Sequence, residues 1–318
     1  MRIGQNPAKS VKEVAVPKRV TVAVLSYIPF LSGFYTQTLD VLKLCLGSIW
    51  ENTTDVEHDL MVFDNGSCQE VIDFLLDAKA QQKIQYLVLS DCNLGKGGAW
   101  NMILAGAPGE IIAYADSDVL FYPGWLGRSI QILETYPNVG MVTSRPFRTP
   151  EQYSSRTIEW AKTTPEAGFQ VGNFLSWEDF SSFVMSLGTS EEQARSWWEG
   201  GGDMRVDYHG VPAQIGASHW QFVAKKSTLQ QFLPFDMSRP MGQVRMLDER
   251  MNAAGFLRLM TADPLAQNMS NQVPVYLGGK PVSTAPEKAT FQKRLLNFRP
   301  VKQILLGMYD RIFKAYYQ

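Results

Sequence analysis

An apolar segment that ends in two aspartates constrains the fold of this chain most. Residues 111–115 are apolar, Asp116 and Asp118 follow with one serine between them, and apolar residues then resume. A short continuous apolar run is typical of a strand that is buried on both faces, as in a parallel sheet. Two carboxylates at its end are costly to bury, and a divalent cation offsets that cost while also binding a phosphate. The segment therefore predicts a cation site at the carboxyl edge of a parallel sheet, facing a phosphorylated substrate.

Strand-like and helix-like segments alternate through the first half of the chain. Ser67 and Glu70 form a capping box that predicts the start of the second helix. The predicted strands are residues 20–27, 59–64, 84–89, 110–115 and 139–144, and the predicted helices are 38–52, 71–80, 99–107 and 125–136. This order predicts an α/β fold with a mainly parallel, Rossmann-like sheet flanked by helices. Right-handed crossovers then place the carboxyl ends of the strands along one edge, where ligands bind.

The composition excludes several classes of protein. The chain has 318 residues, 45% of them hydrophobic, and a net charge of -1, so it can bury a large core and presents no basic surface for nucleic acid. Cys45, Cys68 and Cys92 form neither a zinc pattern nor a disulfide framework, which favours a reducing, cytoplasmic compartment. Residues 1–18 are polar and predict a loose arm rather than a signal peptide. No apolar run is long enough to span a membrane.

The second half of the chain interrupts this alternation. Residues 146–202 are rich in Ser, Glu, Gly and Trp and show no clear strand. The glycines at 200–202 are typical of a lid hinge or of a surface loop. Short helices are expected at 177–187 and 190–198, strands at 205–215 and 217–225, and a helix from 246 that ends at Gly255.

Four polar motifs stand at the ends of the predicted strands. The glycine-rich turn among them is not a dinucleotide fingerprint, because Trp100 occupies the place of the third glycine, and its spacing is not that of a Walker loop. In chain order the motifs are Ser26-Tyr27, Asp64-Asn65-Gly66-Ser67, Asn93-Leu94-Gly95-Lys96-Gly97-Gly98 with Asn101, and Asp116-Ser117-Asp118. This ordered set, which covers the first half of the chain, resembles the motifs of the family 2 glycosyltransferases. The resemblance implies the GT-A fold.

The resemblance also implies a site for a nucleoside-diphosphate sugar. Asp64 can accept a hydrogen bond from a pyrimidine N3–H, which favours a UDP- or dTDP-sugar, although a turn aspartate also bonds its own backbone. Lys96 and the glycines would lie near the diphosphate or the sugar. The donor-binding residues implied are Ser26, Tyr27, Asp64, Asn93, Gly95, Lys96, Gly97, Asn101, Asp116 and Ser117.

A cation, Mg²⁺ or Mn²⁺, is implied as the bridge to the donor diphosphate. Asp118 and Asp116 are its expected ligands, and the cation would stabilise charge on the leaving nucleoside diphosphate. Many relatives add a histidine in a segment like H-M-G-N, where this chain has Asn268-Met269-Ser270-Asn271. Asn268 offers a carbonyl oxygen, which is a weaker ligand than imidazole. We therefore expect weaker cation binding than in those relatives.

Inverting members of the family need a general base that deprotonates the acceptor hydroxyl. The segment 248–256 resembles the family's acidic pair ahead of an Ala-Gly-aromatic sequence, with a shorter spacing. The resemblance implies Asp248 as the base and Glu249 as the second candidate. The alternative is a solvated helix face on which these carboxylates pair with Arg245 or Arg250.

Two neighbouring residues, His219 and Trp220, are expected at the acceptor site. Trp220 could stack on a sugar ring, and His219 could line the same pocket. The alternative is structural, since a single histidine is more often a satisfied group of the scaffold.

These features together predict an inverting, metal-assisted glycosyltransferase that acts on a cell-surface glycan or a lipid-linked acceptor. The predicted regions are the arm 1–18, a donor-binding half 19–145, an acceptor-binding half 146–275 with its insert, and a basic amphipathic tail 276–318. The tail could lie on the inner face of an anionic membrane, or it could pack as a plain C-terminal helix.

Two other functions stay open at this point. A nucleotidyltransferase also binds metal through carboxylates on a similar sheet, but residues 26–33 lack the basic loop that it would need. A non-catalytic nucleotide-sugar binding protein is suggested by Asn268 and by the imperfect acidic pair.

Overall fold

The computed structural model describes residues 3–238, 243–277, Met308 and Arg311. The chain divides into two compact units at Val273, and the first unit carries the sheet and the candidate site. The predicted basic tail lies almost entirely outside the described residues. No helix in the described part of the chain combines the length and the apolar character that crossing a membrane requires.

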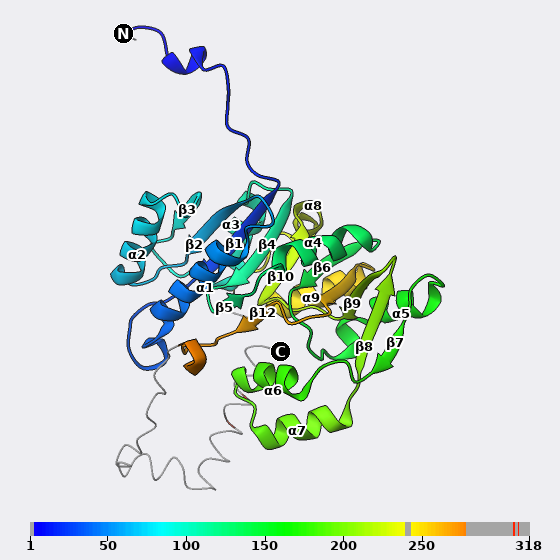
Figure 1. The fold of residues 1–318 in the computed structure, drawn as a ribbon. Coiled ribbons are helices and arrows are strands. Elements are labelled where there is room, and N and C mark those ends of the chain that lie inside the picture. The colour runs from blue at the N-terminus through cyan, green and yellow to red at the C-terminus, as the bar shows by residue number, and fades with distance from the viewer. Residues whose placement is uncertain (1–2, 239–242, 278–307, 309–310, 312–318) are drawn as a thin grey trace, which may run out of the picture. The chain divides into compact units, whose positions relative to one another are not determined.

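A ten-stranded sheet forms the centre of the first unit (Figure 1). Its strand order is β3-β2-β1-β4-β10-β6-β11-β9-β8-β7, and β5 and β12 pair in a separate small sheet. Strands β1 to β4 are parallel, as are β6 and β11, whereas β10, β9 and β7 run antiparallel to their neighbours. The strands are β1 Val20–Ser26, β2 His58–Asp64, β3 Tyr86–Leu89, β4 Ile111–Asp116, β5 Val119–Phe121, β6 Val139–Thr143, β7 Gln170–Gly172, β8 Asp203–Tyr208, β9 Val211–Ile215, β10 Gln221–Lys225, β11 Leu257–Thr261 and β12 Ala266–Asn268.

The central strand β1 sets the position of the polar motifs. Every residue of β1 is buried, as expected for an apolar strand with helices on both faces. Its register places Ser26 beside Asp64 of β2 and Leu25 beside Asp116 of β4. Three of the sequence motifs therefore end neighbouring strands at the same edge, which confirms the predicted parallel arrangement.

Strand β10 departs from the predicted pattern in a way that matters for the site. It lies between β4 and β6 and runs antiparallel to both, so its amino end lies at the carboxyl edge of β4. The backbone N–H of Asp116 donates to the carbonyl of Trp220 at 2.8 Å. His219 and Trp220 thus reach the polar edge from a strand that enters there.

Helices cover both faces of the sheet (Figure 1). Apolar side chains of α1, α2 and α4 pack on one face, and those of α3, α8 and α9 pack on the other. The fully buried Trp100 of α3 meets Tyr114 at 5.4 Å and Phe222 at 6.0 Å between ring centroids. The helices are α1 Thr38–Asn52, α2 Gln69–Ala80, α3 Gly95–Gly106, α4 Trp125–Thr135, α5 Ser155–Thr163, α6 Trp177–Ser186, α7 Glu191–Gly200, α8 Lys226–Leu229 and α9 Gln243–Ala253, with short 3₁₀ turns at η1 Pro7–Ser10, η2 Gly33–Tyr35, η3 Glu151–Tyr153, η4 Gln230–Phe232 and η5 Val275–Leu277.

The predicted capping box at the start of α2 is wrong. The helix begins at Gln69, with Cys68 as its N-cap and no side-chain cap bond. The Ser67 hydroxyl instead accepts the backbone N–H of Ile28 at 2.9 Å. A tertiary contact after β1 uses the hydroxyl that the local pattern assigned to the helix.

The tryptophan-rich insert is more structured than its composition indicated. The expected helices form as α6 and α7, which enclose a small core of Leu175, Phe180 and Ala194. The region also contains α5 and the short strand β7, which sequence analysis missed. β7 is three residues long and mostly exposed, so only its pairing with β8 identifies it as a strand.

A buried ion pair ties this insert to the sheet. The Asp203 carboxylate at the start of β8 is fully buried and receives Arg148 Nε at 2.7 Å. Its second oxygen accepts the backbone N–H groups of Phe174 and Leu175 at 2.7 and 2.8 Å. The segment that leads into α6 is therefore fixed by one carboxylate.

We expect Asp203→Ala to lower the free energy of unfolding by about 3 kcal/mol, because the change leaves the Arg148 charge without its buried partner. Urea denaturation measures this loss. Glu159→Ala is the matched control, because it breaks only the exposed Arg156–Glu159 pair and should cost less than about 1 kcal/mol. Equal losses in the two variants would contradict the assigned role of Asp203.

Candidate active site

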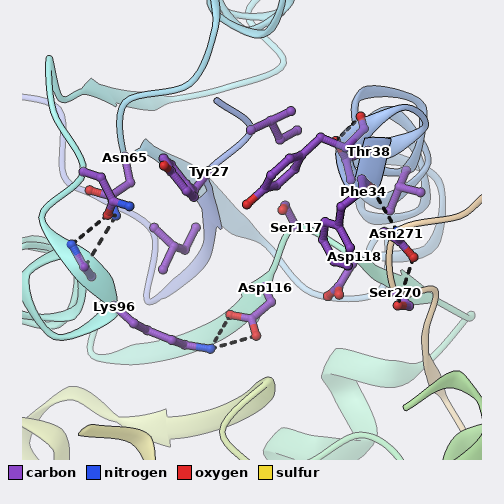
Figure 2. A pocket seen from close by; sticks show the side chains of 16 residues that line it. Tyr27, Phe34, Thr38, Asn65, Lys96, Asp116, Ser117, Asp118, Ser270 and Asn271 are labelled. Atoms are coloured by element: carbon purple, nitrogen blue, oxygen red, sulfur yellow. Dashed lines mark hydrogen bonds and ion pairs between the residues drawn. The ribbon is translucent and has the colours of Figure 1, made fainter. Parts of the chain in front are cut away.

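A pocket of about 410 Å³ opens at the carboxyl edge of β1 and β4 (Figure 2). One part of its wall is aromatic and the other carries carboxylates and a lysine. Of the residues predicted to bind the donor, it brings together Tyr27, Asn93, Gly95, Lys96, Asp116 and Ser117, whereas Ser26, Asp64, Gly97 and Asn101 do not line it. Its lining residues are Leu25, Tyr27, Ile28, Phe34, Tyr35, Thr38, Val41, Asn65, Asn93, Gly95, Lys96, Asp116, Ser117, Asp118, Ser270 and Asn271.

Asp116 is already neutralised by a lysine. Figure 2 shows the Lys96 side chain directed from the first turn of α3 to Asp116, with Nζ 2.8 Å from each carboxylate oxygen. The Tyr114 hydroxyl donates to the same carboxylate at 2.5 Å. Burial, followed by the charge of Asp116, raises the pKa of Tyr114, so the phenol stays protonated and can donate. Asp116 is therefore the less available of the two aspartates for a cation.

Asp118 holds the unsatisfied charge of the site. It lies in the turn between β4 and β5, where its backbone carbonyl accepts the N–H of Met269 at 2.8 Å. Its Oδ1 is buried and has no hydrogen-bond partner among the described residues. Burial, with a further contribution from the charge of Asp116, raises the pKa of Asp118 to about 7, while Lys96 and the Asn268 side chain act in the opposite direction.

The residues around Asp118 fit a divalent cation. The pairing of β12 with β5 places Asn268 opposite Val119, the residue after Asp118. The side chains of Asp118 and Asn268 offer hard oxygen ligands. The buried Oδ1 of Asp118, which lacks a hydrogen-bond partner in the described residues, is suited to coordinate a cation. Within the described residues no group of three or more His, Cys, Asp or Glu gathers as a metal cluster. The remaining ligands would have to come from a bound phosphate or water.

Asp64 is buried behind the pocket. Its Oδ2 accepts the backbone N–H groups of Gly66 and Ser67 at 3.3 and 2.9 Å, which is the turn role that an aspartate also fulfils alone. Its Oδ1 and the hydroxyl of the adjacent Ser26 are buried without a partner in the described part of the chain. Two polar atoms at the end of β1 and β2 are therefore left for a ligand or a water.

The glycine-rich turn is held by amide side chains. Asn65 donates to Asn93 Oδ1 at 2.9 Å and accepts the N–H of Leu94 at 2.9 Å. Asn101 exchanges two bonds with the backbone of Phe235, at 2.9 and 2.7 Å, so its amide is used in packing. These bonds orient the first turn of α3, and with it Lys96.

On the acceptor side, Asp248 lies at the centre of a charged cluster. Arg258 Nη2 donates to its Oδ1, and His219 Nδ1 lies 3.3 Å from its Oδ2. Burial lowers the pKa of Arg258, and the charge of Asp248 acts against that shift. Glu249 instead faces solvent and pairs with Arg245 at 2.9 Å. Of the two carboxylates for which a surface ion pair was the alternative, only Glu249 forms one.

Trp220 has a packing role. Its side chain is only 7% exposed and lies 5.8 Å from the Phe183 ring. Its ring faces are therefore closed to a sugar, which differs from the stacking expected from the sequence. His219 is the open member of the pair, with 34% of its side chain exposed.

Several residues of the site escaped sequence analysis. Arg258 is a charged residue in the fully buried strand β11, and such a charge indicates a carboxylate partner that could have been sought from the sequence. The sequence did not indicate a role for Tyr114, because this residue lies within a buried apolar run. Phe34 of η2 and Asn271 are far apart in the chain, and a hydrogen bond from the Asn271 amide to the Phe34 carbonyl at 2.8 Å joins them at the pocket.

Comparisons with known proteins agree with these features. Residues 34–186 match the family described as Glycosyl transferase family 2. The chain is 28% identical over 150 residues to the uncharacterized glycosyltransferase alr2836 of Nostoc sp., in a match that spans 47% of this chain and 42% of the relative. The chain thus spans less than half of that relative's length.

Solved structures of glycosyltransferases are also similar. The mannosyltransferase PcManGT from Pyrobaculum calidifontis, in complex with GDP-Man and Mn²⁺, has a TM-score of 0.43 and 18% identity, with 78% of this chain and 55% of that chain covered. TarS residues 1–349 from S. aureus has a TM-score of 0.45 and 11% identity over 78% and 59% of the two chains. GalNAc-T7 with UDP, GalNAc and Mn²⁺ has a TM-score of 0.49 and 9% identity over 79% and 44%.

The sheet order, the polar strand ends and the family match indicate the GT-A fold. Residues 34–186, just under half of the chain, are similar to the family 2 glycosyl transferases. The matched region includes Asp64, Lys96, Asp116 and Asp118.

The raised pKa of Asp118 predicts a pH-dependent stability of the metal-free protein. As pH rises above 3.8, the unfolded chain loses this proton before the folded protein does, so unfolding becomes easier up to about pH 7. We expect Asp118→Asn to raise the free energy of unfolding at pH 8 by about 2 kcal/mol and to flatten its pH dependence. Urea denaturation in chelator between pH 4 and 8 checks this, with the exposed Asp91→Asn as the control. Parallel curves for wild type and Asp118→Asn would contradict it.

Proposed function

We propose that this protein transfers a sugar from a nucleoside-diphosphate sugar to an acceptor hydroxyl, with inversion and with help from Mg²⁺ or Mn²⁺. The observation that carries the proposal is the adjacent placement of Lys96, Asp116 and the unsatisfied Asp118 in one pocket at the sheet edge. A site with an unpaired acid, a paired acid and a lysine suits a charged diphosphate and its cation.

The donor would lie along the pocket from its aromatic end to its charged end. Tyr27, Phe34 and Tyr35 offer flat apolar contacts for a base or ribose. The unpaired Oδ1 of Asp64 lies behind the pocket wall, and a pyrimidine N3–H that reached it would satisfy this buried acceptor. A UDP- or dTDP-sugar is the donor that these contacts favour.

The charged end would bind the diphosphate. When bound, a cation held by Asp118 and Asn268, with Asp116 beside it, would supply Lewis-acid stabilisation of the leaving nucleoside diphosphate. Lys96 and the N-terminal amides of α3 add positive potential at the same place. Tyr114 fixes the Asp116 carboxylate, which in turn directs Lys96.

Residues 19–145 would form the donor half and residues 146–275 the acceptor half in this proposal. The cluster of Asp248 and His219 comes from the acceptor half and lies at the same sheet edge as Asp116. A glycan or lipid-linked acceptor and a membrane contact through the tail remain predictions from the sequence, because the tail lies outside the described residues.

A panel of nucleotide sugars tests the proposed function. We expect UDP- or dTDP-sugars to bind with Mn²⁺ more tightly than GDP-sugars do, and to be transferred or hydrolysed. Calorimetry measures binding, and proton NMR of the product shows whether the anomeric configuration inverts. A donor that binds without hydrolysis or transfer on a broad acceptor panel would instead indicate a non-catalytic nucleotide-sugar binding protein.

Lys96→Met tests the charged end of the pocket. We expect donor affinity to fall about 10- to 100-fold, because a charge-assisted hydrogen bond contributes roughly 1.5–3 kcal/mol. Lys43→Met is the control and should bind as wild type, because Lys43 is an exposed lysine of α1 that pairs loosely with Asp40 at 3.5 Å and lies 5.8 Å from the centroid of the Phe74 ring. Unchanged donor affinity in Lys96→Met would remove the lysine from the diphosphate site.

A further inference from the structure

Three side chains, from β11, from α9 and from the segment that leads into β10, form a linked series. Arg258 of β11 is 1% exposed, and its guanidinium donates to Asp248 and, at 2.8 Å, to the carbonyl of Ala217. Asp248 of α9 in turn faces His219 Nδ1 at 3.3 Å. The series runs from a buried cation through a buried carboxylate to an imidazole that reaches solvent.

The segment that carries His219 is held on both sides. Thr143 Oγ1 accepts the N–H of Ser218 at 2.8 Å, and the carbonyl of Trp220 accepts the N–H of Asp116 at 2.8 Å. His219 lies between these two anchors. Its backbone position is therefore fixed next to the carboxylate that ends β4.

His219 and Asp116 also share a face of the sheet. Tyr114 of β4 and Phe222 of β10 stack at 5.1 Å on the face that α3 and α9 cover. Asp116 follows two residues after Tyr114 and meets Lys96 of α3, while His219 meets Asp248 of α9. His219 does not itself line the pocket, but the segment that carries it is hydrogen-bonded to Asp116, which does.

Arg258, Asp248 and His219 differ in their ability to accept a proton. Arg258 stays charged, and both oxygens of Asp248 face a partner. Protonation of Asp248 would leave Arg258 buried without a counter-charge, which is strongly unfavourable. Among the residues that the structure describes, none is a hydrogen-bond partner of His219 Nε2. The imidazole, not the carboxylate, is thus the accessible proton acceptor of the cluster.

We propose that His219 is the general base of sugar transfer and that Asp248 is a positioning residue that holds the imidazole. This inference rests on the proposed function, and it reverses the assignment that the sequence implied for Asp248. Asp248 and Arg258 fix the ring so that Nδ1 carries the proton and Nε2 is free to accept one.

The proton and bond changes balance in one displacement. The acceptor hydroxyl gives its proton to His219 Nε2 while its oxygen bonds to the anomeric carbon. The bond from that carbon to the phosphate oxygen breaks, and its electron pair stays on the departing nucleoside diphosphate. Asp248 stabilises the imidazolium, which returns its proton to water after the products leave.

His219→Gln tests the inference without disturbing the buried pair. We expect kcat for transfer to fall about 1,000-fold, within the range for loss of a general base, with the donor dissociation constant unchanged. His209→Asn is the matched control, because His209 is an exposed turn residue with φ 52°, a conformation that Asn tolerates, and it should keep wild-type transfer. Transfer within threefold of wild type in His219→Gln would overturn the inference.

Chemical rescue separates a catalytic imidazole from a structural one. We expect added imidazole to restore transfer at least tenfold in His219→Ala but not in His219→Gln, whose side chain fills the space. Lack of rescue in a folded His219→Ala that still binds donor would overturn the inference. Asp248→Asn should keep residual transfer through His219, whereas a complete loss of transfer in folded Asp248→Asn with full transfer in His219→Gln would identify Asp248 as the base.

The proposed function and this inference fail in different ways. Wild-type protein that binds donor but never transfers or hydrolyses it refutes the function itself. Wild-type protein that transfers sugar, with His219→Gln equally active, leaves the function in place and refutes only the role of His219.

Discussion

The neutralisation of carboxylates at one edge of the sheet is the constraint on which the site depends. Asp116 is paired with Lys96, and Asp248 is paired with Arg258, in each case through a cation from another element. Burying a carboxylate without such a partner is costly. The Oδ1 of Asp118 has no such partner within the described chain. A ligand that pairs with this oxygen would therefore offset the free-energy cost of burying it. The electrostatics of the fold thus mark where a cation and phosphate belong.

The antiparallel strand β10 determines which residues can join that edge. In a purely parallel sheet, only residues after strands would reach the carboxyl edge. Because β10 enters between β4 and β6 from that edge, the residues before it, His219 and Trp220, lie beside Asp116. The later helix α9, which packs on the face that α3 covers, carries Asp248. One reversal of strand direction joins the second half of the chain to the donor pocket.

The parallel core and the donor edge could be predicted from sequence because their signals are local. The apolar run before Asp116 and the turn at Asn93 to Gly98 each carry their own pattern. The acceptor side could not be predicted in the same way. The pairing of Asp248 with Arg258 depends on a strand ten residues later in the chain, and the closed faces of Trp220 depend on Phe183 from the insert. Such contacts are long-range, and periodicity contains no information about them.

Arg258 changes the chemistry open to the acid beside it. A carboxylate at the end of a pocket is a good proton acceptor only when its protonation does not leave a neighbouring buried cation without a counter-charge. Asp116 fails this condition because of Lys96, and Asp248 fails it because of Arg258, which is buried more deeply. A neutral imidazole that is held by such a paired carboxylate can gain a proton without leaving any buried charge unpaired. The imidazolium that forms lies against Asp248. Because Arg258 pairs with Asp248, the basic group of the cluster is His219, whose exposed side chain an acceptor can reach.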